Sequence, residues 1–336
     1  MEGGKRMNPY RGMRFMVLSA VLSSWLFGCA MEKSATFRTA PEHYQTIIEQ
    51  QKAGISPDQN FLRKLPDMTA EELEGLGDTY IKQDNLAMAI AQYNQALKMD
   101  PARVVTRYKY GVLLLKTGLP KEALGQFQTI LEHDEKFARG YEGIGQALLQ
   151  VGDDLGADQE FRRALSFDPD LWTAHNYLGI LADRRHLHLS AIKAYQTALA
   201  IKPREPRVLN NLGMAYYMNG QYAEAVRSLH LALQAGASSP KVANNLGLAL
   251  SKMKQFSQAF DAFRRGTDLA KAYNNVGIGL LEARRPQRAI SCFEKAIEIQ
   301  PRFYEKASEN LTYARRALAK QAKQGKNMES KLVACL

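Results

Sequence analysis

Residues 206–239 read PRVLNNLGMAYYMNGQYAEAVRSLHLALQAGASS, and the spacing inside this stretch recurs along most of the chain. Gly213 is followed twelve residues later by an alanine, and six such glycines stand 34 residues apart before a seventh follows after 30. The fourteen small residues are Gly77, Ala89, Gly111, Ala123, Gly145, Ala157, Gly179, Ala191, Gly213, Ala225, Gly247, Ala259, Gly277 and Ala289. A fixed period of this length indicates a repeat architecture in which each copy is one supersecondary unit.

Other positions of the repeat predict how each unit folds. Small residues at the glycine and alanine positions let two antiparallel helices approach closely, and the apolar residue before each glycine, such as Leu212, fills the space between them. Four copies carry a proline 24 residues after the glycine, which ends the second helix because proline lacks an N–H. Each helix pair leaves one face uncovered, so only stacking of the units buries a core.

This pattern resembles the tetratricopeptide repeat, and the resemblance covers residues 70–303. It implies an all-α fold, a right-handed α-solenoid of seven repeats with a C-terminal capping helix. The expected repeat units are 70–103, 104–137, 138–171, 172–205, 206–239, 240–269 and 270–303. A lead helical segment is expected at 41–69, the capping helix at 304–322 and a flexible tail at 323–336.

The first forty residues have the features of an export signal. Four basic residues precede an apolar run of 13 residues, Phe15 to Phe27, which is too short to span a bilayer permanently. Leu26-Phe27-Gly28-Cys29 resembles a bacterial lipobox, although Phe27 departs from the small or β-branched residue usual at its place. We therefore expect a signal peptide at 1–28, a lipidated Cys29 and a tether to residue 40. Plain secretion or an uncleaved anchor is the alternative.

By resemblance to the usual sorting rule, Ala30 after the lipidated cysteine directs the protein to the outer membrane, where it would face the periplasm. Two or three acyl chains would anchor it stably, since one chain alone binds a membrane only marginally. The covalent lipid on Cys29 is the only non-protein group expected, with no cofactor or metal.

Charge is distributed unevenly along the chain. The sequence is 46% hydrophobic and 24% charged, which is too apolar for a disordered chain, and its net charge is +11. Residues 41–171 carry a net charge of −7, whereas residues 240–336 carry +10. The basic end has no zinc-finger, winged-helix or RNP pattern, so we expect protein partners and no nucleic acid.

No motif predicts catalysis. The repeats and cap use up residues 70–320, and the sequence has no P-loop, no G-x-S-x-G, no H-E-x-x-H and no dinucleotide fingerprint. We therefore expect no enzyme activity and no small-molecule substrate. His186 and His188 are expected in a solvated turn, because no cysteine or carboxylate cluster accompanies them beyond Asp183.

Two further cysteines leave alternatives open. Cys292 precedes the core position Phe293, which favours a small buried hydrophobe, and Cys335 lies in the expected tail. In an oxidising periplasm the two could instead form a disulfide.

A candidate binding groove lies on the first helices of the last three repeats. Each of these helices has an asparagine two residues before the glycine, a cation four residues earlier and an apolar residue three residues later. The nine residues are Arg207, Asn211, Met214, Lys241, Asn245, Leu248, Lys271, Asn275 and Ile278. Residues i and i+4 share a helix face, so stacking would place them in parallel rows.

The rows suggest a peptide groove biased to acidic or carboxyl-terminal segments, because an asparagine amide can both donate to and accept from a peptide backbone. They resemble the asparagine ladder of glycosyltransferase-type repeats, and they do not match the carboxylate clamp of cytosolic chaperone adaptors. The alternative is that asparagine and lysine simply solvate an exposed helix face.

The lipid anchor, the seven repeats and the length together resemble the TadD family, tetratricopeptide lipoproteins of the Flp or tight-adherence pilus system. The resemblance implies a periplasmic scaffold or adaptor that helps a secretin or another pilus component to assemble. An envelope adaptor that docks peptidases or cell-wall hydrolases is the alternative. A cytosolic chaperone co-factor is opposed by the export signal.

Overall fold

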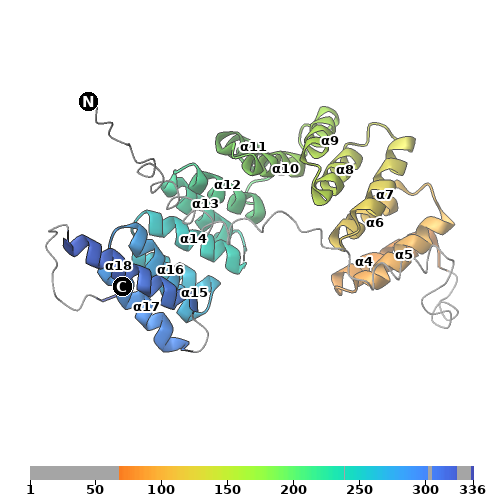
Figure 1. Ribbon diagram of the computed structural model, residues 1–336. Helices are drawn as coiled ribbons and strands as arrows, with labels where there is room; N and C mark the ends of the chain where they lie inside the picture. Colours follow the sequence, from red (N-terminus) through yellow and green to blue (C-terminus); the bar gives the residue numbers. More distant parts are fainter. Residues whose placement is uncertain (1–67, 238, 302–304, 324–333) are drawn as a thin grey trace, which may run out of the picture. The chain divides into compact units, whose positions relative to one another are not determined.

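The computed structural model describes residues 68–237, 239–301, 305–323 and 334–336. Within these residues the chain forms fifteen α-helices and no strand, and the helices follow one another in antiparallel pairs (Figure 1). The predicted all-α fold, an α-solenoid of tetratricopeptide repeats, is confirmed. The predicted signal peptide, lipidated Cys29, tether and almost all of the lead segment lie outside the described residues.

The chain divides into two compact units. The N-terminal unit, described over 68–203, comprises α4 (Ala70–Lys82), α5 (Leu86–Met99), α6 (Val104–Lys116), α7 (Pro120–His133), α8 (Ala138–Val151), α9 (Asp154–Phe167), α10 (Trp172–Arg184) and α11 (His188–Ile201). The C-terminal unit, from residue 204 on, comprises α12 (Pro206–Met218), α13 (Tyr222–Gln234), α14 (Pro240–Lys252), α15 (Phe256–Gly266), α16 (Leu269–Glu282), α17 (Pro286–Ile299) and α18 (Glu305–Lys323).

The two helices of each pair are in contact where the repeat has its glycine. A Cβ added to Gly111 would lie 2.7 Å from the ring of Phe127, and one added to Gly247 would lie 2.6 Å from the ring of Phe263. All seven repeat glycines meet the large residue sixteen positions later in this way, and all seven repeat alanines are fully buried. The period of 34 residues therefore reflects one packing contact, between the repeat glycine and the large residue sixteen positions later, which recurs in every helix pair.

Helix starts are fixed by local hydrogen bonds. The Thr69 hydroxyl accepts from the Glu72 N–H at 3.3 Å, and the Glu72 carboxylate accepts from the Thr69 N–H at 2.8 Å. This capping box satisfies backbone donors that the first turn of α4 leaves free. Ser239 and Asp268 cap α14 and α16 with their side chains.

The turn inside each helix pair has one residue in the left-handed region, seven positions after the repeat glycine. This conformation suits glycine, because other residues bring their Cβ close to the backbone. The seven residues are Asp84, Gly118, Gly152, His186, Gly220, Lys254 and Arg284. His186 therefore lies at a turn of fixed geometry, with φ of 59°.

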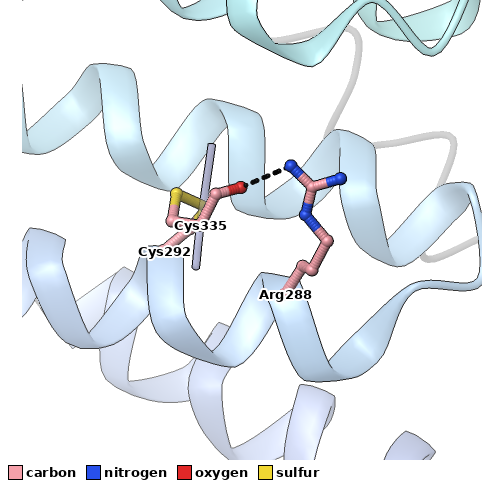
Figure 2. The surroundings of a disulfide bond; sticks show 3 residues. All are labelled: Arg288, Cys292 and Cys335. Carbon is pink, nitrogen blue, oxygen red and sulfur yellow. Dashed lines mark hydrogen bonds between the residues drawn. A yellow bond between two sulfur atoms is a disulfide. The ribbon is translucent and has the colours of Figure 1, made fainter. Parts of the chain in front are cut away.

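A disulfide joins the end of the described chain to α17. Cys292 and Cys335 are bonded, with their Cα atoms 4.9 Å apart, and both are buried (Figure 2). The interpretation of Cys292 as only a small buried hydrophobe is thus wrong, and the alternative of a disulfide is the one the structure adopts. The predicted flexible tail needs the same correction at residues 334–336, where Cys335 is held against the helix.

Candidate protein-binding groove

The nine predicted groove residues lie on α12, α14 and α16, the first helices of three successive pairs. Successive first helices contact one another, α12 with α14, α14 with α16, and α16 with α18. The cations Arg207, Lys241 and Lys271 are exposed. Met214, Leu248 and Ile278 are half-buried. The helices α12, α14 and α16 therefore present cations to solvent beside half-buried apolar side chains.

The asparagines have a different environment from the one expected. Asn245 is fully buried, and its side-chain amide donates to the side-chain oxygen of Asn210 at 2.9 Å. Asn275 is half-buried and donates to Asn244 at 3.4 Å. Each bond joins one first helix to the first helix before it. Much of the amide capacity expected to serve a peptide is therefore used between helices.

The capping helix continues this series. Asn310 of α18 donates to the side-chain oxygen of Asn274 on α16 at 3.0 Å. We call the three bonds, Asn245 to Asn210, Asn275 to Asn244 and Asn310 to Asn274, the asparagine ladder. The acceptors lie three residues before the repeat glycines, and their role was not among the predictions from the sequence. The recurring Asn-Asn pairs at 210–211, 244–245 and 274–275 were the available signal.

The ladder leaves one polar atom without a partner. The side-chain oxygen of Asn245 is buried and accepts no hydrogen bond among the described residues. Leaving a buried acceptor unpaired costs free energy, so this step of the ladder stabilises less than a fully satisfied one. Within α12, the side-chain oxygen of Asn211 accepts from the amide of Asn210 at 3.4 Å.

In the N-terminal unit the equivalent positions of α4 and α6 hold charged residues. Glu74 on α4 takes the place of the ladder acceptor, and Lys109 on α6 takes the place of the donor, with their charged atoms 2.7 Å apart. Arg103 and Thr106 also donate to the Glu74 carboxylate, the former at 3.0 Å. Lys109 further pairs with Asp78 at 2.7 Å. We call these five residues the ionic cluster.

The hydrogen bonds of the ionic cluster hold Glu74 in its charged form. Burial alone would raise the pKa of this carboxyl, but hydrogen bonds from Lys109, Thr106 and Arg103 outweigh that effect and lower the pKa to about 2. Burial raises the pKa of the Tyr93 phenol, and its hydrogen bond to Asp78, 2.5 Å long, raises it further. The cluster is thus an internally neutralised link between α4 and α6.

His186 lies in the α10–α11 turn, whereas His188 is the first residue of α11 and its side chain is 16% exposed, so the predicted solvated turn holds only for His186. His188 contacts Asp183 through its Nδ1 atom at 3.1 Å, and the Tyr195 hydroxyl donates to the other Asp183 oxygen at 3.0 Å. Burial raises the pKa of the Asp183 carboxyl, although both hydrogen bonds oppose the shift. Across the described ranges, no group of three or more histidine, cysteine or acidic side chains is arranged to hold a metal ion.

These observations define the class of protein as a helical-repeat protein. Family models described as tetratricopeptide repeat match residues 70–103, 206–235 and 270–303, and others described as tetratricopeptide repeat and TPR repeat match 240–273 and 190–220. Over these residues the chain consists of tetratricopeptide repeats, and repeats of this kind suggest a scaffold for protein–protein interaction.

Known proteins resemble parts of the chain. DnaJ homolog subfamily C member 7 of Homo sapiens is 29% identical over 99 residues, which are 30% of this chain and 20% of that protein. A crystal structure of MamA is 30% identical, covering 47% of this chain and 93% of that one, with a TM-score of 0.39. The Cut9–Hcn1 hetero-tetramer of the APC/C is 18% identical, covering 89% of this chain and 64% of that one, with a TM-score of 0.52, and shows the fold alone.

Helices in the described part of the chain are unsuited to crossing a bilayer. None of them combines the length and the apolar character that a membrane span requires.

Proposed function

We propose that the protein is a non-catalytic scaffold lipoprotein, anchored in the outer membrane through lipid on Cys29 and facing the periplasm. There it binds partner proteins through its repeats and assists assembly of a pilus or secretion machine of the Flp type. The secretin, or another pilus-assembly component, is the proposed partner.

The Cys292–Cys335 disulfide is the observation that carries the export part of this proposal. Disulfides persist in oxidising compartments such as the bacterial periplasm and are rare in the reducing cytosol. The bond supports export independently of the signal-like sequence before Cys29, because it is formed by residues at the other end of the chain. A cytosolic role is correspondingly disfavoured.

The exposed cations support a groove that takes an acidic partner. Among the described residues, neither Arg207 nor Lys241 forms an ion pair. Lys271 pairs with Asp268 at 2.7 Å, but both side chains are substantially exposed, and such pairs contribute little to stability. Three cations on successive helices would therefore be available to steer and orient acidic side chains of a partner.

A capture experiment from solubilised outer membrane tests the binding proposal. We expect the full chain to capture the secretin or another pilus component, identified by mass spectrometry, and the triple change Arg207→Gln, Lys241→Gln and Lys271→Gln to reduce that capture about tenfold. The exposed cations Arg264, Arg265 and Arg316, changed likewise, form the matched control. Equal capture by all three proteins would exclude the groove, and recovery of a peptidase or murein hydrolase would exclude the pilus assignment.

Labelling tests the anchor separately. Radioactive palmitate should enter the full chain, and Cys29→Ser should abolish both the label and recovery in the outer-membrane fraction. An unlabelled chain in the cytosolic fraction would contradict the localisation.

A further inference from the structure

A pocket separate from the groove lies between the starts of α15 and α17, the second helices of two successive pairs. Its volume is about 300 Å³, and it opens to solvent. Phe256, which is 4% exposed, supplies an aromatic wall. Lys254, Arg285 and Arg288 also line it, and residues 255–258 and Leu336 complete it.

The charged side chains of this pocket all have one sign. Three cationic side chains line it, and no aspartate or glutamate does. Among the described residues, none of the three cations takes part in an ion pair with a carboxylate. The Arg285 guanidinium lies 5.6 Å from the centre of the Phe256 ring, a weak cation–π contact that leaves its N–H donors available. The pocket therefore combines a net positive charge of its side chains with an apolar wall.

The disulfide positions Leu336, the remaining apolar residue of the pocket. Cys335 is bonded to Cys292, and its carbonyl oxygen accepts from the Arg288 guanidinium at 3.1 Å (Figure 2). Arg288 and Cys292 are four residues apart on α17, so the two contacts fix residues 334–336 on one face of the helix. Leu336, 43% exposed, is thereby placed at the edge of the pocket.

We propose that this pocket is a second protein-binding site, for an acidic segment that carries an apolar side chain, and that the Cys292–Cys335 disulfide is needed to complete it. The apolar side chain lies against Phe256 and Leu336, and the flanking carboxylates pair with Lys254, Arg285 and Arg288. The proposal rests on the proposed function only in that the chain binds proteins. Its location on α15 and α17 separates it from the groove on α12, α14 and α16.

Fluorescence anisotropy with the purified full chain tests this site. The probe is a fluorescein-labelled peptide with the sequence GSDFELDG, and the control peptide, GSNFQLNG, lacks only the charges. We expect the probe to bind and the control peptide to bind at least about tenfold more weakly. The triple change Lys254→Gln, Arg285→Gln and Arg288→Gln should weaken probe binding about tenfold, and raising the salt concentration should weaken it as well.

Two comparisons locate the effect. The matched triple Arg264→Gln, Arg265→Gln and Arg316→Gln removes equal charge from exposed positions outside the pocket and should leave probe binding within about twofold of the unmodified chain. The triple change of Arg207, Lys241 and Lys271 to Gln, called the groove triple, shows whether the probe binds at the groove instead. Loss of probe binding in the groove triple alone would overturn the pocket and leave the proposed function standing. Failure of the probe to bind any protein would also overturn the pocket, without affecting the capture of a pilus component.

Reduction of the disulfide tests whether residues 334–336 are needed to complete the pocket. Dithiothreitol reduces the disulfide by thiol–disulfide exchange, leaving two thiols on the chain and a cyclic disulfide on the reagent. We expect the reduced chain, and the Cys335→Ser variant, to bind the probe several-fold more weakly while circular dichroism shows unchanged helix content. Tighter binding after reduction would mean that residues 334–336 cover the pocket, and unchanged binding would mean that they are irrelevant to it. Either result would overturn this part of the proposal.

Discussion

At the same repeat position, α4 and α6 of the N-terminal unit and α12 and α14 of the C-terminal unit are connected by different chemistry. In the N-terminal unit Glu74 accepts from Lys109 across 2.7 Å, with Arg103 and Thr106 on the same carboxylate. In the C-terminal unit Asn210 accepts from Asn245 across 2.9 Å, with neutral groups on both sides. Both connections use the same positions of the repeat, and their side chains differ.

The difference determines which charges a partner can meet. The ionic cluster uses its carboxylates and Lys109 on one another, and Glu74 is only 8% exposed. The asparagine ladder connects helices without using charge, so Arg207, Lys241 and Lys271 stay on the exposed face. An acidic segment of a partner would therefore find exposed cations in the C-terminal unit, of which Lys271 pairs with the exposed Asp268. In the N-terminal unit the charged side chains of the ionic cluster stabilise the packing of α4 against α6, so the stability of that unit depends on pH.

The largest expected effect comes from removing the hub of the ionic cluster. Glu74→Ala leaves Lys109, Arg103 and Thr106 without their shared acceptor and should destabilise the N-terminal unit by about 3 kcal/mol. Hydrogen exchange of α4 and α6, followed by mass spectrometry, reports this unit locally, which a global melting curve of a repeat protein does not. Glu71→Ala, an exposed change on the same helix, is the control. Equal protection in the two variants would remove the cluster as the source of stability.

Acid should weaken the same link. The pKa of Glu74 is lowered to about 2 from the ordinary 4.5, so its stabilisation is present above pH 4.5 and is lost as the pH falls towards 2. Lowering the pH from neutral to 2.5 should reduce the stability of α4 and α6, measured by hydrogen exchange, by about 2 kcal/mol more in the unmodified chain than in Glu74→Gln. This figure allows for solvent screening around Lys109. The variant isolates this one carboxyl from all others that titrate. Parallel losses in the two proteins would contradict the assignment.

A neutral step should cost less to remove. Asn245→Ala takes the donor from Asn210, but it also removes the buried Asn245 oxygen that has no partner, so the two effects partly offset each other. We expect about 1 kcal/mol, seen as faster exchange in α12 and α14. Lys241→Ala, exposed on the same helix, should change exchange little. A cost as large as that of Glu74→Ala would mean that the ladder and the ionic cluster are equivalent in strength.

Much of the fold is predictable from the sequence because one contact repeats. The glycine must be small for the ring sixteen residues later to fit, as Gly111 and Phe127 show, and seven copies make that constraint visible. The ladder was only half predictable. Spacing of i and i+4 describes one helix, whereas Asn245 reaches an acceptor 35 residues earlier, on the preceding first helix. The disulfide spans 43 residues, and no periodicity relates Cys292 to Cys335.

The smallest expected effect is at the end of the ladder. Asn310 on α18 is half-buried and donates to Asn274, which is 6% exposed. Because water can replace a partly exposed donor, Asn310→Ala should cost only about 0.5 kcal/mol, and the faster exchange should be confined to α18 and the facing part of α16. Glu309→Ala, exposed on the same helix, gives the baseline. If faster exchange instead spread to α14 and α12, the ladder would act as one cooperative element, and the contrast with the single ionic cluster would be sharper than pairwise bonds imply.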